Sequence, residues 1–278
     1  PRLDRLLTLF FTHPIQKAFK TKARPIPILM YHQISDIEDK NSIPYYRTST
    51  SPRRFQEQMN FLYKNGYAVV NLSDVPGLLQ SRDQDAKKYV VLTFDDGYGD
   101  FLNAVPILKQ YGFPATVFLP SGLLPEKSSA PERHQHLSWE EVRNLQALGI
   151  HFGSHTVSHT RLQDLPYAEM EMEIKKSKET IEEKTGKEVT DFSLPFAFPE
   201  EDRLFKNNLK VLLLESGYRV GVSTIIGCAQ SKDDIFFLKR LPINSLDDLP
   251  FFKAKLEGGY NWLHALQYTK KLLKIKPF

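Results

Sequence analysis

Short apolar runs alternate along this chain with longer segments in which apolar residues recur at helical spacing. An unbroken run such as 89–94 is typical of a strand covered on both faces. The segment after Ser51 has Pro52 at its first position and stops at Gly66, which is typical of a helix. The predicted strands are 25–31, 67–71, 89–94, 115–119, 150–154, 189–194, 219–224 and 235–238, and the predicted helices are 52–65, 74–80, 101–111, 138–149, 165–185, 204–215, 247–256 and 262–273. This alternation predicts an α/β fold, a single-domain distorted (β/α) barrel with about seven parallel strands.

The chain of 278 residues shows no internal repeat and no low-complexity linker, so one domain over residues 25–245 is expected. Residues 1–24 form an N-terminal extension and residues 246–278 a C-terminal helical one. The first extension has an apolar patch around 6–11, followed by Lys17, Lys20, Lys22 and Arg24. We expect it to be either packed on the domain or frayed, with peripheral membrane contact through the two basic ends as the alternative.

The composition excludes several kinds of protein. A net charge of +4 without a concentrated basic face gives no reason to expect a nucleic-acid partner. Cys228 is the only cysteine, so an internal disulfide and a four-cysteine metal site are excluded. No apolar run reaches the ~18–20 residues of a membrane span, and no signal peptide is evident. The compartment stays open, with the cytoplasm favoured unless the chain is trimmed.

Two adjacent carboxylates, Asp95 and Asp96, follow the run 89–94 and precede Gly97. Taken alone, Asp-Asp-Gly predicts only a turn. Parallel strands, however, deliver the residues after them to the open end of an α/β fold, where active sites lie. A turn at Gly97 would let the two acids take different roles in one site.

Two histidines four residues apart, His155 and His159, follow the predicted strand 150–154. Such a pair can bind one metal ion from one side of a helical turn, although an isolated pair is more often exposed. This pair follows a strand directly, as the aspartates do, so both pairs would open onto one face of a barrel. By contrast, His134 and His136 lie in a polar loop and are expected to be exposed.

The two motifs together, TFDDG at 93–97 and HTVSH at 155–159, resemble the polysaccharide deacetylase family, also called the NodB-homology domain or carbohydrate esterase family 4. The similarity extends over about residues 25–245. The front end, ILMYHQIS at 28–35 and SPRRFQEQMNFLYKNGYAVVNL at 51–72, is similar to the poly-N-acetylglucosamine deacetylase branch.

The resemblance implies a metal-dependent hydrolase that removes N-acetyl groups from a glycan or glycoconjugate containing N-acetylglucosamine. Asp96, His155 and His159 would hold a divalent metal, with Zn²⁺ the expected ion. Asp95 would be the general base that takes a proton from the attacking water, which the metal activates.

The resemblance also implies an oxyanion-stabilising group, a general acid and an arginine that orients the base. In the segments that carry these three groups, the sequence departs from the family's pattern. In the segment 192–197, the backbone N–H of Phe196 would stabilise the oxyanion, and Ala197 replaces a glycine. The usual late histidine is missing. His32, after the first strand, is the preferred general acid, ahead of His264. The third-motif arginine is missing too; Arg240 would either orient Asp95 or form a surface salt bridge.

These departures leave a second hypothesis open, a catalytically impaired relative that binds carbohydrate or acts in assembly. The intact set of Asp95, Asp96, His155 and His159 argues against it. The sequence identifies neither the substrate, the metal in the cell nor the oligomeric state.

Overall fold

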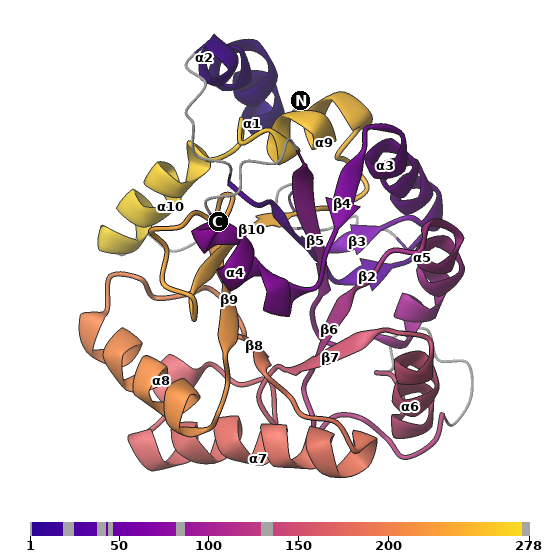
Figure 1. Cartoon of the computed structure of the whole chain (residues 1–278). Helices are drawn as coiled ribbons and strands as arrows, with labels where there is room; N and C mark the ends of the chain where they lie inside the picture. The colour runs from indigo at the N-terminus through magenta and orange to yellow at the C-terminus, as the bar shows by residue number, and fades with distance from the viewer. Residues whose placement is uncertain are drawn as a thin grey trace.

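The computed structural model describes residues 2–18, 25–37, 43, 47–81, 87–128 and 136–273. Its central feature is a closed ring of parallel strands in the order β1-β10-β9-β8-β7-β6-β5, with β5 pairing back to β1. The predicted barrel of seven parallel strands is therefore confirmed (Figure 1). The seven strands are β1 (Ile28–Tyr31), β5 (Lys88–Phe94), β6 (Thr116–Leu119), β7 (His151–Ser154), β8 (Asp191–Ser193), β9 (Val220–Ile226) and β10 (Leu238–Pro242).

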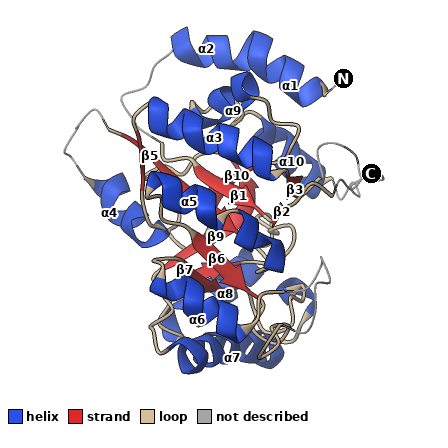
Figure 2. Ribbon diagram, turned by 90° about the vertical axis from the view of Figure 1, so that its right-hand side faces the viewer, coloured by secondary structure: helices blue, strands red, loops and turns tan. Residues whose placement is uncertain are grey.

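Three further strands lie outside the ring. The predicted strand 67–71 is present as β4 (Tyr67–Val69), but it pairs only with the first residues of β5, before β1 joins that edge. The strands β2 (Gln33–Ile34) and β3 (Ser49–Thr50) form a small parallel pair just after β1. They lie at the right-hand end of the barrel in Figure 2.

Helices surround the ring (Figure 1). Most begin at a cap that the sequence makes visible, such as Ser51 and Ser138, each of which accepts a hydrogen bond from the backbone N–H three residues on. The helices around the barrel are α3 (Pro52–Lys64), α5 (Val105–Tyr111), α6 (Trp139–Ala147), α7 (Tyr167–Thr185), α8 (Arg203–Glu215), α9 (Leu249–Leu256) and α10 (Leu263–Leu272), with 3₁₀ turns η3 (Gly99–Asn103) and η4 (Leu162–Asp164). No helix in the described residues is both long and apolar enough to cross a membrane.

The N-terminal extension is a helical segment made of α1 (Leu3–Leu7), the π-helical turn η1 (Thr8–Thr12) and α2 (His13–Ala18). Arg2 fastens it to the C-terminal part of the chain through an ion pair with the buried Asp247 (Nη1–Oδ1, 2.9 Å). Trp262 Nε1 donates to the hydroxyl of Thr8 at 3.1 Å. Of the two favoured outcomes for this extension, packing on the domain is the one observed for residues 2–18. Lys20, Lys22 and Arg24 lie outside the described residues.

The apolar core has two layers, because alternate residues of a strand face opposite sides. One layer lies between the strands and the surrounding helices. The other fills the interior of the barrel with residues such as Ile28, Val91 and Val222. The 3₁₀ turn η2 (Leu72–Asp74) and α4 (Val75–Gln80) close the amino end of the barrel, with Leu72 and Val75 packed on that interior. The amino end faces the viewer in Figure 1 and lies at the left in Figure 2. Because apolar residues close this end, we expect the polar residues of a site at the opposite, carboxyl end.

One strand is displaced from its predicted position. The prediction placed it at 235–238 with Arg240 beyond it, but β10 runs from Leu238 to Pro242 and contains Arg240. Phe236 and Phe237 lie in a turn and are buried there. These two apolar residues were therefore a sign of burial, which was mistaken for a strand. Arg240 consequently belongs to the barrel interior.

Candidate active site and metal centre

Asp95 and Asp96 point different ways because the backbone turns between them. The inward face of β5 carries Val91 and Thr93, and Asp95 continues that face with its backbone N–H still bonded to the carbonyl of Tyr31 (3.0 Å). Asp96 then takes a left-handed conformation with φ of 70°, and Gly97 follows with φ of 57°. The turn expected at Gly97 thus begins one residue earlier.

Asp95 forms a bidentate ion pair with Arg240 inside the barrel. Arg240 Nη1 lies 2.7 Å from Asp95 Oδ1, and Arg240 Nη2 lies 2.7 Å from Oδ2. The Arg240 side chain is fully buried, and its Nε donates to the carbonyl of Ser223 at 3.0 Å. Of the two predicted alternatives, contact with Asp95 is therefore the one observed, and a surface salt bridge is not. Burial raises the pKa of Asp95, but the Arg240 guanidinium together with His155 and His32 holds that pKa below its ordinary value.

Asp96, His155 and His159 converge on one point, with one ligand atom from each within 4.8 Å of the others. Asp96 Oδ1 lies 3.3 Å from His155 Nε2 and 3.0 Å from His159 Nε2. This buried oxygen nevertheless has no hydrogen bond of good geometry among the described residues. Three side chains that can each offer a metal-ligand atom thus face one another.

This arrangement fits a bound cation. His155 Nδ1 lies 2.7 Å from the carbonyl of Ser193, so a neutral ring donates there and presents the lone pair of Nε2 to Asp96. Burial lowers the pKa of His155, but Asp96 and Asp95 outweigh burial and raise that pKa, so positive charge is favoured at this point. Two imidazoles and one carboxylate are a ligand set that Zn²⁺ uses in catalytic sites.

Two residues support Asp96 from the neighbouring loops. His136 Nδ1 lies 2.7 Å from the backbone carbonyl of Asp96, and the His136 ring stacks on Tyr98 with centroids 5.4 Å apart. The prediction that His136 is exposed is therefore wrong, because a loop residue can turn inward to satisfy a buried carbonyl. His134 lies outside the described residues. Burial and the negative charge of Asp96 raise the pKa of Tyr98 to about 12, so its hydroxyl stays protonated.

Phe196 lies beside His159, one of the three side chains that could hold a metal. Its ring centroid is 4.8 Å from that of His159, and its φ is 61°. The strained residue is thus Phe196, while Ala197, which replaces the family's glycine, is not left-handed. Thr224 Oγ1 donates to the Phe196 carbonyl at 3.1 Å and accepts from the Phe198 N–H at 2.8 Å, which fixes this loop. Oxyanion stabilisation by the Phe196 N–H stays a prediction.

His32 borders a cavity of about 230 Å³ over the carboxyl ends of β1, β10 and β9. Ala197 borders it from the other side, and Gln267 of α10 forms part of its wall. The charge of His32 acts on both Asp95 and Asp96 and lowers the pKa of each, although burial opposes this. His264, the less favoured candidate acid, instead lies on α10 and pairs with Glu200 (Nε2–Oε2, 2.9 Å).

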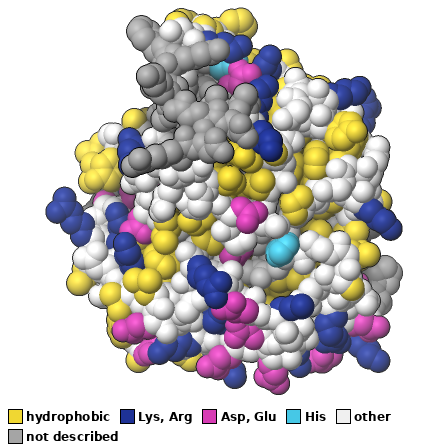
Figure 3. All heavy atoms as spheres, viewed as in Figure 1, with side chains coloured by type: hydrophobic (Ala, Val, Ile, Leu, Met, Phe, Trp, Pro, Cys, Tyr) yellow, Lys and Arg dark blue, Asp and Glu magenta, His cyan; other side chains and the backbone are white. Residues whose placement is uncertain are grey.

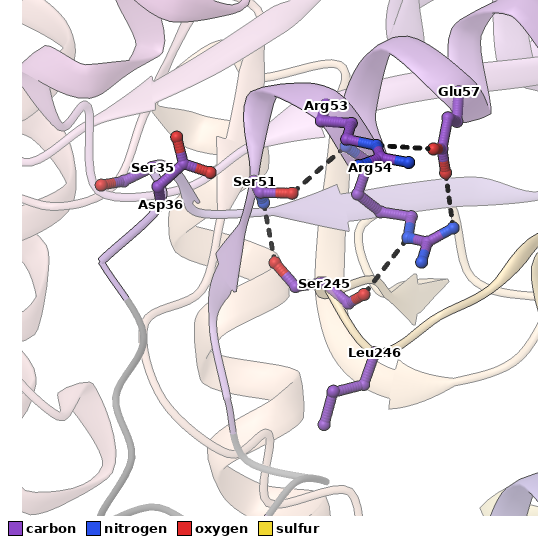
Figure 4. A pocket seen from close by; sticks show the side chains of 8 residues that line it. All are labelled: Ser35, Asp36, Ser51, Arg53, Arg54, Glu57, Ser245 and Leu246. Carbon is purple, nitrogen blue, oxygen red and sulfur yellow. Dashed lines mark hydrogen bonds and ion pairs between the residues drawn. The ribbon is translucent and has the colours of Figure 1, made fainter.

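A second cavity, of about 460 Å³, lies between β2, the start of α3 and the segment after β10 (Figure 4). Three of its charged groups, Arg53, Arg54 and Glu57, pair with one another. Arg54 binds Glu57 (Nη1–Oε2, 2.6 Å) and the carbonyl of Ser245 (3.3 Å from Nε). Because these groups satisfy each other, we assign no chemistry to this cavity.

Comparison with known proteins decides the family. Residues 82–215 match the family model for polysaccharide deacetylase. Over 224 residues the chain is 30% identical to YxkH of Bacillus subtilis (strain 168), which is named for the same family. The alignment covers 80% of this chain and 73% of YxkH. This chain belongs to the polysaccharide deacetylase family. The resemblance drawn from TFDDG and HTVSH is therefore confirmed.

Other polysaccharide deacetylases and related structures are also similar to the chain. It is 28% identical over 139 residues to the poly-beta-1,6-N-acetyl-D-glucosamine N-deacetylase of Escherichia coli (strain K12), covering 46% of this chain and 20% of that protein. The structure of the Streptococcus pyogenes deacetylase PplD in complex with acetate superposes with a TM-score of 0.73 at 26% identity. That superposition covers 84% of this chain and 99% of PplD. Polysaccharide deacetylases are generally metal-dependent. Among the described residues, Asp96, His155 and His159 form a group that could hold a metal.

Two further residues, Ser193 and Glu173, contribute to the site and were not predicted from the sequence. The Ser193 hydroxyl accepts from Arg240 Nη2 at 3.1 Å, and the Ser193 carbonyl orients His155. Glu173, on α7, binds the loop that carries the two histidines. Ser193 lay in a recognised strand; Glu173 gave no signal, because it is one of several acids on a charged helix.

Proposed function

We propose that this protein removes N-acetyl groups from an N-acetylated glycan or glycoconjugate containing N-acetylglucosamine, with Zn²⁺ held by Asp96, His155 and His159. The observation that carries the proposal is the placement of Asp95 and its Arg240 partner beside these three ligand side chains. A metal-binding group with a fixed carboxylate next to it is what hydrolysis of an amide requires.

The metal would supply Lewis-acid activation of the attacking water and of the substrate carbonyl. Asp95 accepts the proton of that water. Arg240 keeps Asp95 ionised and holds both of its oxygens in a fixed orientation. The Phe196 N–H stabilises the negative charge that develops on the carbonyl oxygen.

His32 protonates the leaving amine. Since His32 borders the 230 Å³ cavity, the sugar that carries the amine occupies this cavity, while its acetyl group points toward the metal ligands.

The deciding experiment combines metal analysis with acetate release from an N-acetylated chito-oligosaccharide. We expect about one Zn²⁺ per chain, acetate release, loss of activity with a chelator and recovery with Zn²⁺. A protein that binds metal but releases no acetate would favour the second hypothesis, a catalytically impaired carbohydrate-binding relative. A protein that retains no metal would overturn the proposed centre.

The role of His32 has its own test. His32→Ala should lower turnover by about 10²–10⁴-fold, because a positioned general acid contributes that much, while metal content stays normal. His264→Ala is the matched control and should keep its activity. Turnover of His32→Ala close to wild type would remove His32 from the mechanism.

We further propose that residues 25–245 form the catalytic unit. As a separate proposal, the N-terminal extension contacts an anionic membrane surface. The supporting observation is that Leu3, Phe10, Phe11 and Ile15 are exposed on this helical segment. Hydrophobic side chains also gather at the upper edge of the molecule in Figure 3, over α1 and α2.

Substituting Phe10 and Phe11 by Ser should abolish sedimentation with vesicles of phosphatidylglycerol and phosphatidylcholine. Leu204→Ser, at an exposed apolar position on α8, should leave it unchanged. If wild-type protein does not sediment with these vesicles, the membrane proposal is wrong.

A further inference from the structure

The loop that carries both histidine ligands has a strained backbone. Within 155–159, Thr156 has φ of 67° and His159 has φ of 54°. A left-handed conformation is unfavourable for a non-glycine residue, because it brings Cβ too close to the following carbonyl oxygen. Such residues persist only where the surrounding structure determines their conformation. Something outside the loop must therefore hold it.

Glu173 binds the loop from one side. Its carboxylate is buried on the inner face of α7, with 6% of the residue exposed. Glu173 Oε2 accepts from the backbone N–H of Val157 at 2.8 Å and of Ser158 at 3.0 Å. Glu173 Oε1 accepts from the hydroxyl of Ser158 at 2.8 Å. The two N–H groups between the strained residues therefore converge on one carboxylate, as they do on a bound anion.

The carbonyl groups of the loop are bound from the other side. Ser121 N–H donates to the Thr156 carbonyl at 3.0 Å, and Gly122 N–H donates to the Val157 carbonyl at 2.8 Å. A Cβ atom at Gly122 would lie 2.9 Å from the Val157 carbonyl oxygen, so only glycine fits this contact. The loop is thus held between α7 and the turn after β6.

Glu173 differs from the other acids of α7. Glu179 forms a surface ion pair with Lys176, and Glu171 forms one with Lys175. Glu173 has no ion pair with a cation in the described part of the chain, and its carboxylate oxygens are bound by the loop donors. A carboxylate placed for helix solubility would face solvent, so this one serves the loop.

We propose that Glu173 is a positioning residue that holds His155 and His159 in their ligating arrangement before metal binds. This rests on the proposed metal centre. Because the loop is formed in advance, metal binding does not have to supply the free energy that orders it. Loss of Glu173 therefore weakens metal binding, whereas Asp95, Arg240 and His32 are left in place.

The test is titration of metal-free protein with Zn²⁺ in competition with a chromophoric chelator. Glu173→Ala should bind Zn²⁺ about 10–100-fold more weakly, the usual effect of removing a group that orients metal ligands. Glu173→Gln should stay within a few-fold of wild type, because its amide oxygen can accept both N–H groups and its NH₂ can donate to Ser158. Glu179→Ala is the matched control on the same helix and should bind like wild type.

A second readout separates positioning from general destabilisation. With saturating Zn²⁺, acetate release by Glu173→Ala should recover toward the wild-type rate. Ser158→Ala, which removes one of the three bonds without changing α7, should bind Zn²⁺ several-fold more weakly, and it decides the matter together with Glu173→Gln if Glu173→Ala does not fold. Zn²⁺ affinity of folded Glu173→Ala equal to wild type overturns the role of Glu173. Failure of wild-type protein to bind Zn²⁺ overturns instead the proposed metal centre.

Discussion

Two buried aspartates lie at opposite ends of this barrel and behave in opposite ways. Asp95 ends β5 at the carboxyl end, where Arg240 holds it charged and its pKa is lowered. Asp191 begins β8 at the amino end, where it accepts a hydrogen bond from the Thr190 hydroxyl at 3.0 Å. Burial raises the pKa of Asp191 to about 6, and the charge of Asp74 adds to this. Similar burial thus gives a permanent charge at one end and a titrating group at the other.

The difference shows what the two ends are built for. At the carboxyl end, polar side chains from β5, β8 and β10 meet around Asp95, and their mutual bonds make its charge tolerable. At the amino end, apolar residues from η2 and α4 close the barrel, so a charge there is a cost without a partner. Each of the following substitutions removes one of the two aspartates or the arginine that pairs with Asp95.

The largest effect is expected from Asp95→Asn, which removes the proposed base but keeps the shape of the side chain. Turnover should fall by about 10²–10⁴-fold, because a neutral amide cannot accept the proton of water. Bound metal should stay near the wild-type amount, since Asp95 is outside the group of Asp96, His155 and His159. Acetate release together with metal analysis checks both statements, and wild-type turnover would contradict the role of Asp95.

Arg240→Met should leave Asp95 buried without its ion-pair partner, so that burial raises its pKa as it does that of Asp191. A buried carboxylate left without its partner typically costs about 3–5 kcal/mol of unfolding free energy, measurable by urea denaturation. The pKa of Asp95 should rise, so the activity that remains should increase with pH. The double variant Asp95→Asn/Arg240→Met should be more stable than Arg240→Met alone; if it is not, the two residues are not coupled.

Asp191→Asn should have the smallest effect on the free energy of unfolding, and it should stabilise the protein where Arg240→Met destabilises it. The pKa of Asp191 in the folded protein lies above its unfolded value of ~3.9, so folding favours the protonated form and stability falls as pH rises from about 4 to 6. Removing the charge should therefore raise the unfolding free energy by about 1–3 kcal/mol at pH 8 and by almost nothing below pH 4. Acetate release should not change. Thermal unfolding at the two pH values provides the measurement, and a variant destabilised equally at both would refute the account.

The barrel and the chemistry at strand ends were predictable because they depend on local patterns. The run 89–94 and the spacing of His155 and His159 follow from strand and metal-site rules that need no tertiary information. The bonds of Arg240 and Glu173 were not predictable in this way. Each depends on which face of a distant strand or helix meets the site, and one arginine or glutamate among many on a charged surface carries no local sign of that.

If Asp95 is the base, as proposed, its ion pair with Arg240 also sets when the protein becomes active during its synthesis. The two residues are 145 positions apart, and β10 is the last strand of the ring to be made. A growing chain that has passed residue 159 already contains Asp95 and all three metal-ligand side chains, but Asp95 has no fixed orientation until β10 docks between β1 and β9. Under the proposed function, catalytic competence therefore arrives together with closure of the barrel.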